Sequence, residues 1–216
     1  MNESKFDSDL ALRELVAAIV AGDAAVVARM LTETPNLSTA TFQAGATRTA
    51  AKESFVDAVR RYIVIGDTAL HFAAAAYQTD VARKLIASGA NVRARNRFGD
   101  EPLHAAAIGS PGSTKWNPAA QSATITFLIK SGADPNAASK RGVTPLHIAV
   151  RTRSAAAVTS LLDLGVDPTR TNKNGSSPML LAQHNTGRPG SGSPEAKAQQ
   201  QGIVLLLEQR VQLPCS

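Results

Sequence analysis

Three of the four histidines occupy equivalent positions, which raises the question of metal binding or acid–base chemistry. His71, His104 and His147 each follow a leucine and lie five residues after a glycine. An imidazole can bind zinc at about 2 Å or act as a general base near neutral pH. These histidines belong to successive copies of one repeated unit, and packed helices lie about 10 Å apart. Because that separation is too large for a shared metal ion, we expect no metal site.

A catalytic nucleophile is equally hard to assemble from this sequence. The single cysteine, Cys215, is the penultimate residue, and a nucleophile needs a base and an orienting group beside it. The glycine-rich run 187–192 contains a proline and lacks the lysine of a phosphate-binding loop. Neither a Gly-x-Ser-x-Gly nor a His-Glu-x-x-His motif occurs. We therefore expect a protein that is not an enzyme and uses no cofactor.

The spacing of the glycines reveals an internal repeat that must position these histidines. Gly66 precedes Gly99 by 33 residues and Gly142 precedes Gly175 by 33, whereas Gly99 and Gly142 are 43 apart. In each full unit a threonine or proline begins a short helix, and a second, apolar helix ends at a glycine. The second helices carry Val81, Leu85 and Ile86, then Ile125, Leu128 and Ile129, then Val158, Leu161 and Leu162, and they end before Gly89, Gly132 and Gly165.

The segments after these second helices point to a known repeat family. They read Ala90-Asn91-Val92, Ala133-Asp134-Pro135-Asn136 and Val166-Asp167-Pro168. Together with Thr144-Pro145-Leu146-His147 and its two counterparts, they resemble ankyrin repeats, whose period is 33 residues. The resemblance covers residues 66 to about 183. It implies an all-α solenoid of stacked helix-turn-helix units with short β-hairpin fingers. It also implies that His71, His104 and His147 are structural, with rings hydrogen-bonded to neighbouring backbone.

The repeat register predicts a single ankyrin-repeat domain over residues 1–216. Its end units depart from the consensus because a terminal unit has a neighbour on one side only. We expect an N-terminal capping repeat over 8–35, an inserted segment over 36–65, full repeats over 66–98, 99–141 and 142–174, and a C-terminal capping repeat over 175–213. The inserted segment is expected to contain a helix, because its apolar residues fall on one helical stripe: Phe55, Val56, Val59, Tyr62 and Ile63.

Two further insertions, 109–119 and 186–193, lie between the paired helices of later units. The first contains Trp116, the only tryptophan, and tryptophan often anchors protein interfaces. The alternative is that Trp116 folds back over the helices of its own unit. The same two alternatives apply to the inserted segment 36–65, which either covers the groove of the solenoid or offers a partner site.

Composition and charge indicate a basic protein of a reducing compartment. The net charge is +6 and the pI about 9.8, which favours acidic proteins, nucleic acids or anionic membranes as partners. One cysteine cannot form an intrachain disulfide. Residues 1–7 contain two acids where a signal peptide needs a basic start, and no run approaches the ~20 apolar residues of a membrane span. We expect a cytoplasmic monomer.

Basic side chains recur in the predicted fingers, and they are the residues that most clearly suggest a binding function. Arginine pairs with carboxylates through two parallel hydrogen bonds, so stacked fingers would present a basic ladder to an acidic protein. Strand alternation predicts Arg93, Arg95 and Arg97 in one row. The alternative is a solvated edge that aids solubility. The candidate partner-binding residues are Arg93, Arg95, Arg97, Phe98, Trp116, Lys140, Arg141, Arg170 and Lys173.

The sequence therefore predicts a non-catalytic protein–protein interaction module. It would act as a scaffold, adaptor or inhibitor and bind a partner with an acidic surface through its fingers and concave helical face. The alternative is an electrostatic binder of nucleic acid or anionic surfaces through the basic ladder. No stacking row of aromatic residues accompanies the basic residues, which makes nucleic acid a poorer fit. A purely structural spacer is the third possibility.

Overall fold

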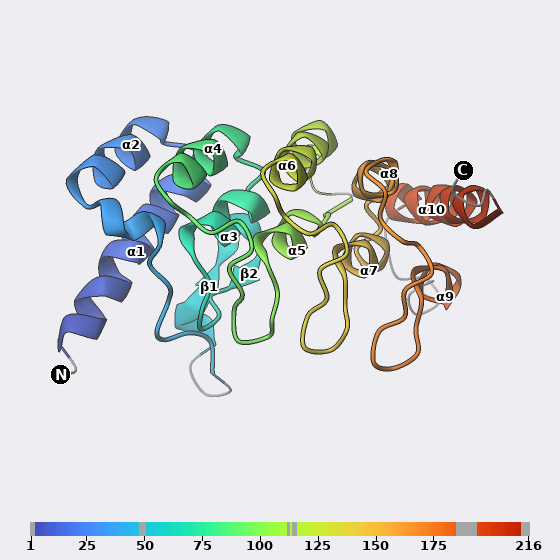
Figure 1. Ribbon diagram of the computed structural model, residues 1–216, viewed down its shortest axis with the longest axis horizontal. Helices are drawn as coiled ribbons and strands as arrows, with labels where there is room; N and C mark the ends of the chain where they lie inside the picture. The colour runs from blue at the N-terminus through green and yellow to red at the C-terminus, as the bar shows by residue number, and fades with distance from the viewer. Residues whose placement is uncertain (1–2, 48–50, 112, 114–115, 185–193, 213–216) are drawn as a thin grey trace. The chain divides into compact units, whose positions relative to one another are not determined.

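The computed structural model describes residues 3–47, 51–111, 113, 116–184 and 194–212. Helices dominate these residues, together with one small two-stranded sheet (Figure 1). The chain divides into two compact units, Met1–Ala105 and Ala106–Ser216. Cys215, residues 186–193 and part of the insertion 109–119 lie outside the described residues. Among the described helices, none combines the length and apolar character needed to cross a membrane.

Unit 1 contains two helical pairs, α1 (Glu3–Ala21) with α2 (Ala24–Glu33) and α3 (Ala69–Ala75) with α4 (Thr79–Ala87). The turn between α1 and α2 forms at Gly22, and the Asp23 carboxylate caps α2 by accepting the Val26 N–H at 3.0 Å. The apolar stripes of the four helices meet in a shared core that excludes water. Its fully buried members include Leu12, Leu15, Ile19, Val27, Leu70, Phe72 and Leu85.

The α-helix predicted for the apolar stripe of the inserted segment is absent from the structure, so that prediction is wrong. It consists of the 3-10 turns η1 (Pro35–Ser38), η2 (Lys52–Ser54) and η3 (Asp57–Val59) and the strands β1 (Phe55–Val56) and β2 (Arg61–Tyr62). Phe55 pairs with Tyr62 across the two antiparallel strands. Arg60 turns the chain with a left-handed φ of 48°, which a continuous α-helix cannot contain. The two aromatic side chains therefore meet across a hairpin instead of along a helix.

Backbone hydrogen bonds join the two ends of the inserted segment, which cover the start of α3. The Phe42 N–H donates to the Asp67 carbonyl at 2.9 Å, the Gly66 N–H donates to the Phe42 carbonyl at 2.8 Å, and the Ala46 N–H donates to the Ile63 carbonyl at 2.8 Å. The Phe42 side chain is fully buried and lies edge-on to Phe72, with ring centroids 6.0 Å apart. This part of the insertion therefore covers the repeat core.

The remaining helices are α5 (Pro102–Ala106), α6 (Pro118–Lys130), α7 (Pro145–Arg151), α8 (Ala155–Asp163), α9 (Pro178–His184) and α10 (Pro194–Gln212). In unit 2, α8 packs against α6, α7 and α10, and α9 packs against α7 and α10. Asn117, Thr144 and Ser154 cap the N-termini of α6, α7 and α8 with side-chain oxygens. The core includes Ile125, Leu128, Leu146, Leu161 and Leu207, all fully buried.

Candidate binding surface

The structure contains three turn-based fingers, the first at residues 91–100 in unit 1 and the second and third at 134–143 and 167–176 in unit 2 (Figure 1). Each finger reverses at a turn closed by one polar side chain. Asn96, Ser139 and Asn172 accept backbone N–H groups from the residues two and four positions later. A glycine in a left-handed conformation follows three residues after each acceptor, with φ of 78°, 72° and 75°.

This turn leaves two residues with exposed side chains at each fingertip. They are Arg97 and Phe98 in the first finger, Lys140 and Arg141 in the second, and Lys173 and Asn174 in the third, and all are exposed. Within each unit the backbone fixes a tip to the chain before it. The Arg97 N–H donates to the Ile65 carbonyl at 2.8 Å, and the Lys173 N–H donates to the Arg141 carbonyl at 3.0 Å. The backbone of each of these tips is thus fixed in place.

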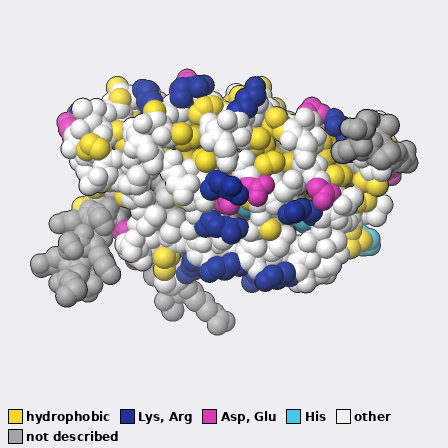
Figure 2. All heavy atoms as spheres, viewed as in Figure 1, with side chains coloured by type: hydrophobic (Ala, Val, Ile, Leu, Met, Phe, Trp, Pro, Cys, Tyr) yellow, Lys and Arg dark blue, Asp and Glu magenta, His cyan; other side chains and the backbone are white. Residues whose placement is uncertain are grey.

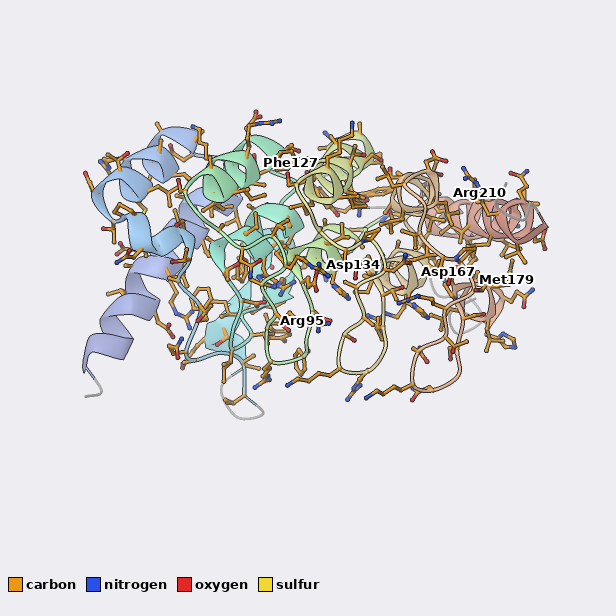
Figure 3. All side chains as sticks on the ribbon, in the orientation of Figure 1. Arg95, Phe127, Asp134, Asp167, Met179 and Arg210 are labelled. Carbon is orange, nitrogen blue, oxygen red and sulfur yellow. The ribbon has the colours of Figure 1, made fainter. Side chains whose placement is uncertain are left out.

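The arginines of the first finger are largely engaged within unit 1. Arg95 directs its Nε to the Gly99 carbonyl at 3.2 Å and lies 3.6 Å from a carboxylate oxygen of Glu101 (Figure 3). Arg97 donates to the Ala46 carbonyl at 3.1 Å and covers the Phe98 ring, 4.9 Å from its centroid. Residues 91–98 form no strand, so strand alternation does not apply to them. Arg93, Arg95 and Arg97 are all exposed, and their alignment in a single row stays a prediction.

A buried polar cluster anchors the first finger to the inserted segment. Arg61 forms an ion pair with Asp67 at 2.6 Å, and the Asn96 amide donates to the same carboxylate oxygen at 2.9 Å. The other oxygen of Asp67 accepts the Val64 N–H at 2.8 Å. Asp67 is fully buried, and the Arg61 guanidinium lies 5.5 Å from the Phe72 ring centroid. Sequence reasoning missed this cluster, because hydrophobic periodicity gives no signal for a buried ion pair and Asn96 lies 29 residues beyond Asp67.

The repeated histidines connect helix starts to finger ends. Nδ1 of His71, His104 and His147 accepts the N–H of Thr68, Glu101 and Thr144 at 3.1, 3.0 and 3.3 Å. Nε2 of His71 donates to the Asp100 carbonyl at 3.1 Å, and that of His147 donates to the Ser176 carbonyl at 3.0 Å. Each of these two rings uses both nitrogens in backbone bonds, which is the arrangement implied by the family resemblance.

Burial controls the titration of these rings. It lowers the pKa of His71 to about 4, with Arg61 acting in the same direction and the Asp67 carboxylate opposing. Burial also lowers the pKa of His147, against the effect of its bond to the Ser176 carbonyl. Both histidines are consequently neutral near pH 7. A neutral ring with one donor and one acceptor matches the two backbone groups that each ring meets.

The fingertips of unit 2 present their charges to solvent. Lys140, Arg141 and Lys173 are exposed, and among the described residues no carboxylate or other acceptor engages their charged groups. Arg170 differs, because it donates to the Asn136 carbonyl at 3.0 Å and lies 3.9 Å from Asp167. Asp134 and Asp167 begin the second and third fingers at the ends nearest α6 and α8 (Figure 3). Figure 2 shows Lys and Arg side chains over the finger region.

Trp116 is held inside unit 2 by a buried glutamine. Its indole N–H donates to Gln121 Oε1 at 3.0 Å, and the Ser154 hydroxyl donates to the same oxygen at 2.8 Å. The Gln121 amide nitrogen donates to the carbonyls of Ala106 and Ile108 at 2.9 and 3.1 Å. Trp116 is only partly buried, but its polar group is used within the unit, as the fold-back alternative requires.

Helical pairs joined by short turns, with fingers between successive pairs, define a helical repeat protein that presents loops from a scaffold. Comparison with protein families makes the class specific. The family described as "Ankyrin repeat" matches residues 65–97, and the one described as "Ankyrin repeats (many copies)" matches residues 128–182. The chain is an ankyrin-repeat protein. Such proteins are generally protein–protein interaction modules and are typically non-catalytic. No curated protein matched the sequence.

Proposed function

We propose that this protein binds an acidic segment of a partner protein through the fingertips of unit 2. The observation that carries the proposal is the arrangement of Lys140, Arg141 and Lys173. Their side chains are exposed and have no acceptor among the described residues, while a backbone bond fixes the second tip beside the third. Because the backbone of the tips is already fixed, binding orders only the long side chains and not the loops, which favours affinity for a complementary anionic segment.

The partner chemistry follows from the groups at the tips. Arg141 offers a planar guanidinium suited to a carboxylate, and the two lysines provide mobile point charges on either side of it. The proposal treats the module as a scaffold, adaptor or inhibitor without catalytic activity, working as a cytoplasmic monomer. A basic ladder that extends over all three fingers, and a contribution from the concave helical face, stay predictions.

Affinity capture with quantitative mass spectrometry tests the proposal. The wild-type protein, the double variant Arg141→Glu/Lys173→Glu and a matched control, Lys130→Glu/Lys197→Glu, are each immobilised and exposed to nuclease-treated lysate. The control reverses two exposed cations on α6 and α10 of the same unit. We expect discrete acidic proteins that are retained by the wild type and the control and lost from the fingertip variant. Equal retention by all three proteins would contradict the proposal.

Salt dependence separates this proposal from the electrostatic alternative. Binding to duplex DNA weakens with a slope in log affinity of about 0.9 per neutralised phosphate. A steep slope for duplex DNA, together with loss of the captured material after nuclease treatment, would support nucleic acid as the ligand. Retention of a defined protein at physiological salt, with weak DNA binding, supports the acidic protein partner.

A further inference from the structure

The inserted hairpin, residues 55–62, carries two aromatic side chains that remain partly in solvent. Phe55 and Tyr62 are direct cross-strand partners, with ring centroids 4.8 Å apart. Their exposed fractions are 37% and 46%. A cross-strand aromatic pair stabilises a hairpin through the ring surfaces that touch each other. The outward ring surfaces are not needed for that role and remain available to another molecule.

Two further exposed apolar side chains lie where the hairpin meets the first finger. Ile65 is 40% exposed and Phe98 is 48% exposed. The bond from the Arg97 N–H to the Ile65 carbonyl joins the chain after β2 to the fingertip that carries Phe98. We name Phe55, Tyr62, Ile65 and Phe98 the aromatic surface. Of the aromatic side chains that the structure describes, Phe55, Tyr62 and Phe98 are the exposed ones, so exposed rings concentrate in this part of unit 1.

The charges around the aromatic surface are unevenly distributed. In the hairpin and η2, Lys52 and Arg60 balance Glu53 and Asp57, and Arg61 is paired with the buried Asp67. The first finger, residues 91–100, in contrast carries three arginines and one acid, Asp100, and Arg95 is paired with Glu101. The Arg97 guanidinium has five N–H donors, and its bond to the Ala46 carbonyl uses one nitrogen. The hairpin therefore contributes apolar area, and the finger contributes positive charge at one edge of it.

We propose that the aromatic surface is a second docking site, which binds an extended acidic segment of a partner protein that carries a large apolar side chain. The apolar side chain would pack on the rings and Ile65, and a flanking carboxylate would meet Arg97. Interface anchors are typically aromatic or arginine residues surrounded by polar contacts. This site lies in a different unit from the fingertip cations and uses different residues, so the two proposals can fail independently.

Selection from a phage-displayed library of random 12-residue peptides tests this site. The full-length protein is the bait, and the enriched peptides are synthesised with a fluorophore for polarisation measurements. We expect a consensus with one large apolar residue and at least two flanking Asp or Glu residues. Affinity should fall by about tenfold or more in Ile65→Ser/Phe98→Ser, which leaves the aromatic pair of the hairpin intact. Phe55→Ser/Tyr62→Ser should lower the affinity as well.

Two matched controls make the outcome decisive. Leu180→Ser/Leu205→Ser removes two similarly exposed apolar side chains from unit 2, and Arg141→Glu/Lys173→Glu removes the fingertip cations. Both should bind the selected peptide within about twofold of the wild type, a difference well under 1 kcal/mol. The proposal is overturned if no acidic, apolar consensus emerges or if Ile65→Ser/Phe98→Ser binds as tightly as the wild type. It is also overturned if a fluorescent dT12 oligonucleotide binds this surface more tightly than the peptide.

Discussion

The first finger and the two fingers of unit 2 share one turn but use their basic side chains in opposite ways. In unit 1, Arg95 and Arg97 contact the finger and the inserted segment, and Arg61 anchors that segment at Asp67. In unit 2, Lys140, Arg141 and Lys173 extend from tips that Ser139, Asn172 and backbone bonds hold, and their own side chains take no part. The number of cations in a finger is therefore a poor guide to the charge that a partner can reach.

Removal of the Asp67 carboxylate should produce the largest difference between the units. Asp67→Ala leaves Arg61 without its ion-pair partner in a site where the side chain is 12% exposed. We expect the free energy of unfolding to fall by about 3 to 5 kcal/mol, because breaking a buried pair strands a charge. The comparison variant Asp167→Ala removes an exposed pair with Arg170 and should cost about 1 kcal/mol or less. Urea denaturation measures the free energy of unfolding of both variants. Equal losses would contradict the distinction between a buried pair in unit 1 and an exposed pair in unit 2.

Lowering the pH should reduce the stability of unit 1, because His71 binds a proton more readily in the unfolded chain than in the folded one. The folded protein holds the pKa of His71 at about 4, below the 6.5 of an unfolded histidine. The unfolded chain therefore binds a proton first as the pH falls, and stability that is fully present above pH 6.5 is lost on the way to pH 4. The loss attributable to this ring is on the order of 3 kcal/mol.

Comparison of His71→Gln with the wild type isolates this contribution. Urea denaturation at pH 7, 5.5 and 4 should show a shallower dependence on pH in the variant. Asp67, Arg61 and Asp100 surround position 71 in both proteins, so their own contributions to the pH dependence largely cancel in the comparison. His147→Gln, at the equivalent position in unit 2, should also reduce the pH dependence, since burial lowers that pKa as well. If the free energy of unfolding depended on pH equally in His71→Gln and the wild type, His71 would not be the source of the acid sensitivity.

Replacement of the fingertip glycines measures how closely the two tips of unit 2 pack against each other. Gly142 and Gly175 have similar left-handed φ values of 72° and 75°. A Cβ at Gly142 would lie 3.0 Å from the Lys173 nitrogen, whereas nothing lies within 4 Å of one at Gly175. We expect Gly175→Ala to cost about 1 kcal/mol from backbone strain alone and Gly142→Ala about 2 kcal/mol. Thermal unfolding compares them, and equal costs would mean that the tips are loosely joined.

Charge reversal should give the smallest effects on stability. Arg141→Glu/Lys173→Glu alters side chains without an intramolecular acceptor among the described residues and should change the free energy of unfolding by less than about 0.5 kcal/mol. Arg95→Glu/Arg97→Glu places a carboxylate beside Glu101 and removes the bond to Ala46, so it should cost about 1 to 2 kcal/mol. Circular dichroism during denaturation distinguishes the two variants, and the reverse order would contradict the contrast between the fingers.

The sequence was sufficient to predict the repeat architecture because local signals and the repeat period agree. Leucine and alanine patterns, helix caps such as Thr144 and the recurring glycines each specify the same helix-turn-helix unit. The family matches over 65–97 and 128–182 confirm that prediction. The fingertip turns had a readable signal as well, since an Asn or Ser precedes each glycine by three residues, although the strand alternation rule pointed elsewhere.

The inserted segment escaped prediction because its structure depends on specific side-chain contacts, one of them with a residue far along the chain. Phe55, Val59 and Tyr62 fit a helical stripe, but Asp67 draws Arg61 and the Val64 N–H to itself and Phe42 occupies the core beside Phe72. Local periodicity contains no information about those contacts. For the same reason the sequence could place arginines in the first finger but could not show that Arg95 and Arg97 were already engaged.

The backbone bonds that join the fingertips within each unit have an evolutionary consequence. The Arg97 and Lys173 N–H groups donate to main-chain carbonyls, and the side chains at those positions take no part. Almost any residue can supply the same N–H, with proline the exception. A substitution at Lys173 therefore keeps this backbone bond, whereas one at Arg97 also removes the side-chain bond to the Ala46 carbonyl. The tip that carries Lys173 can thus change its chemistry by single substitutions on an unchanged scaffold.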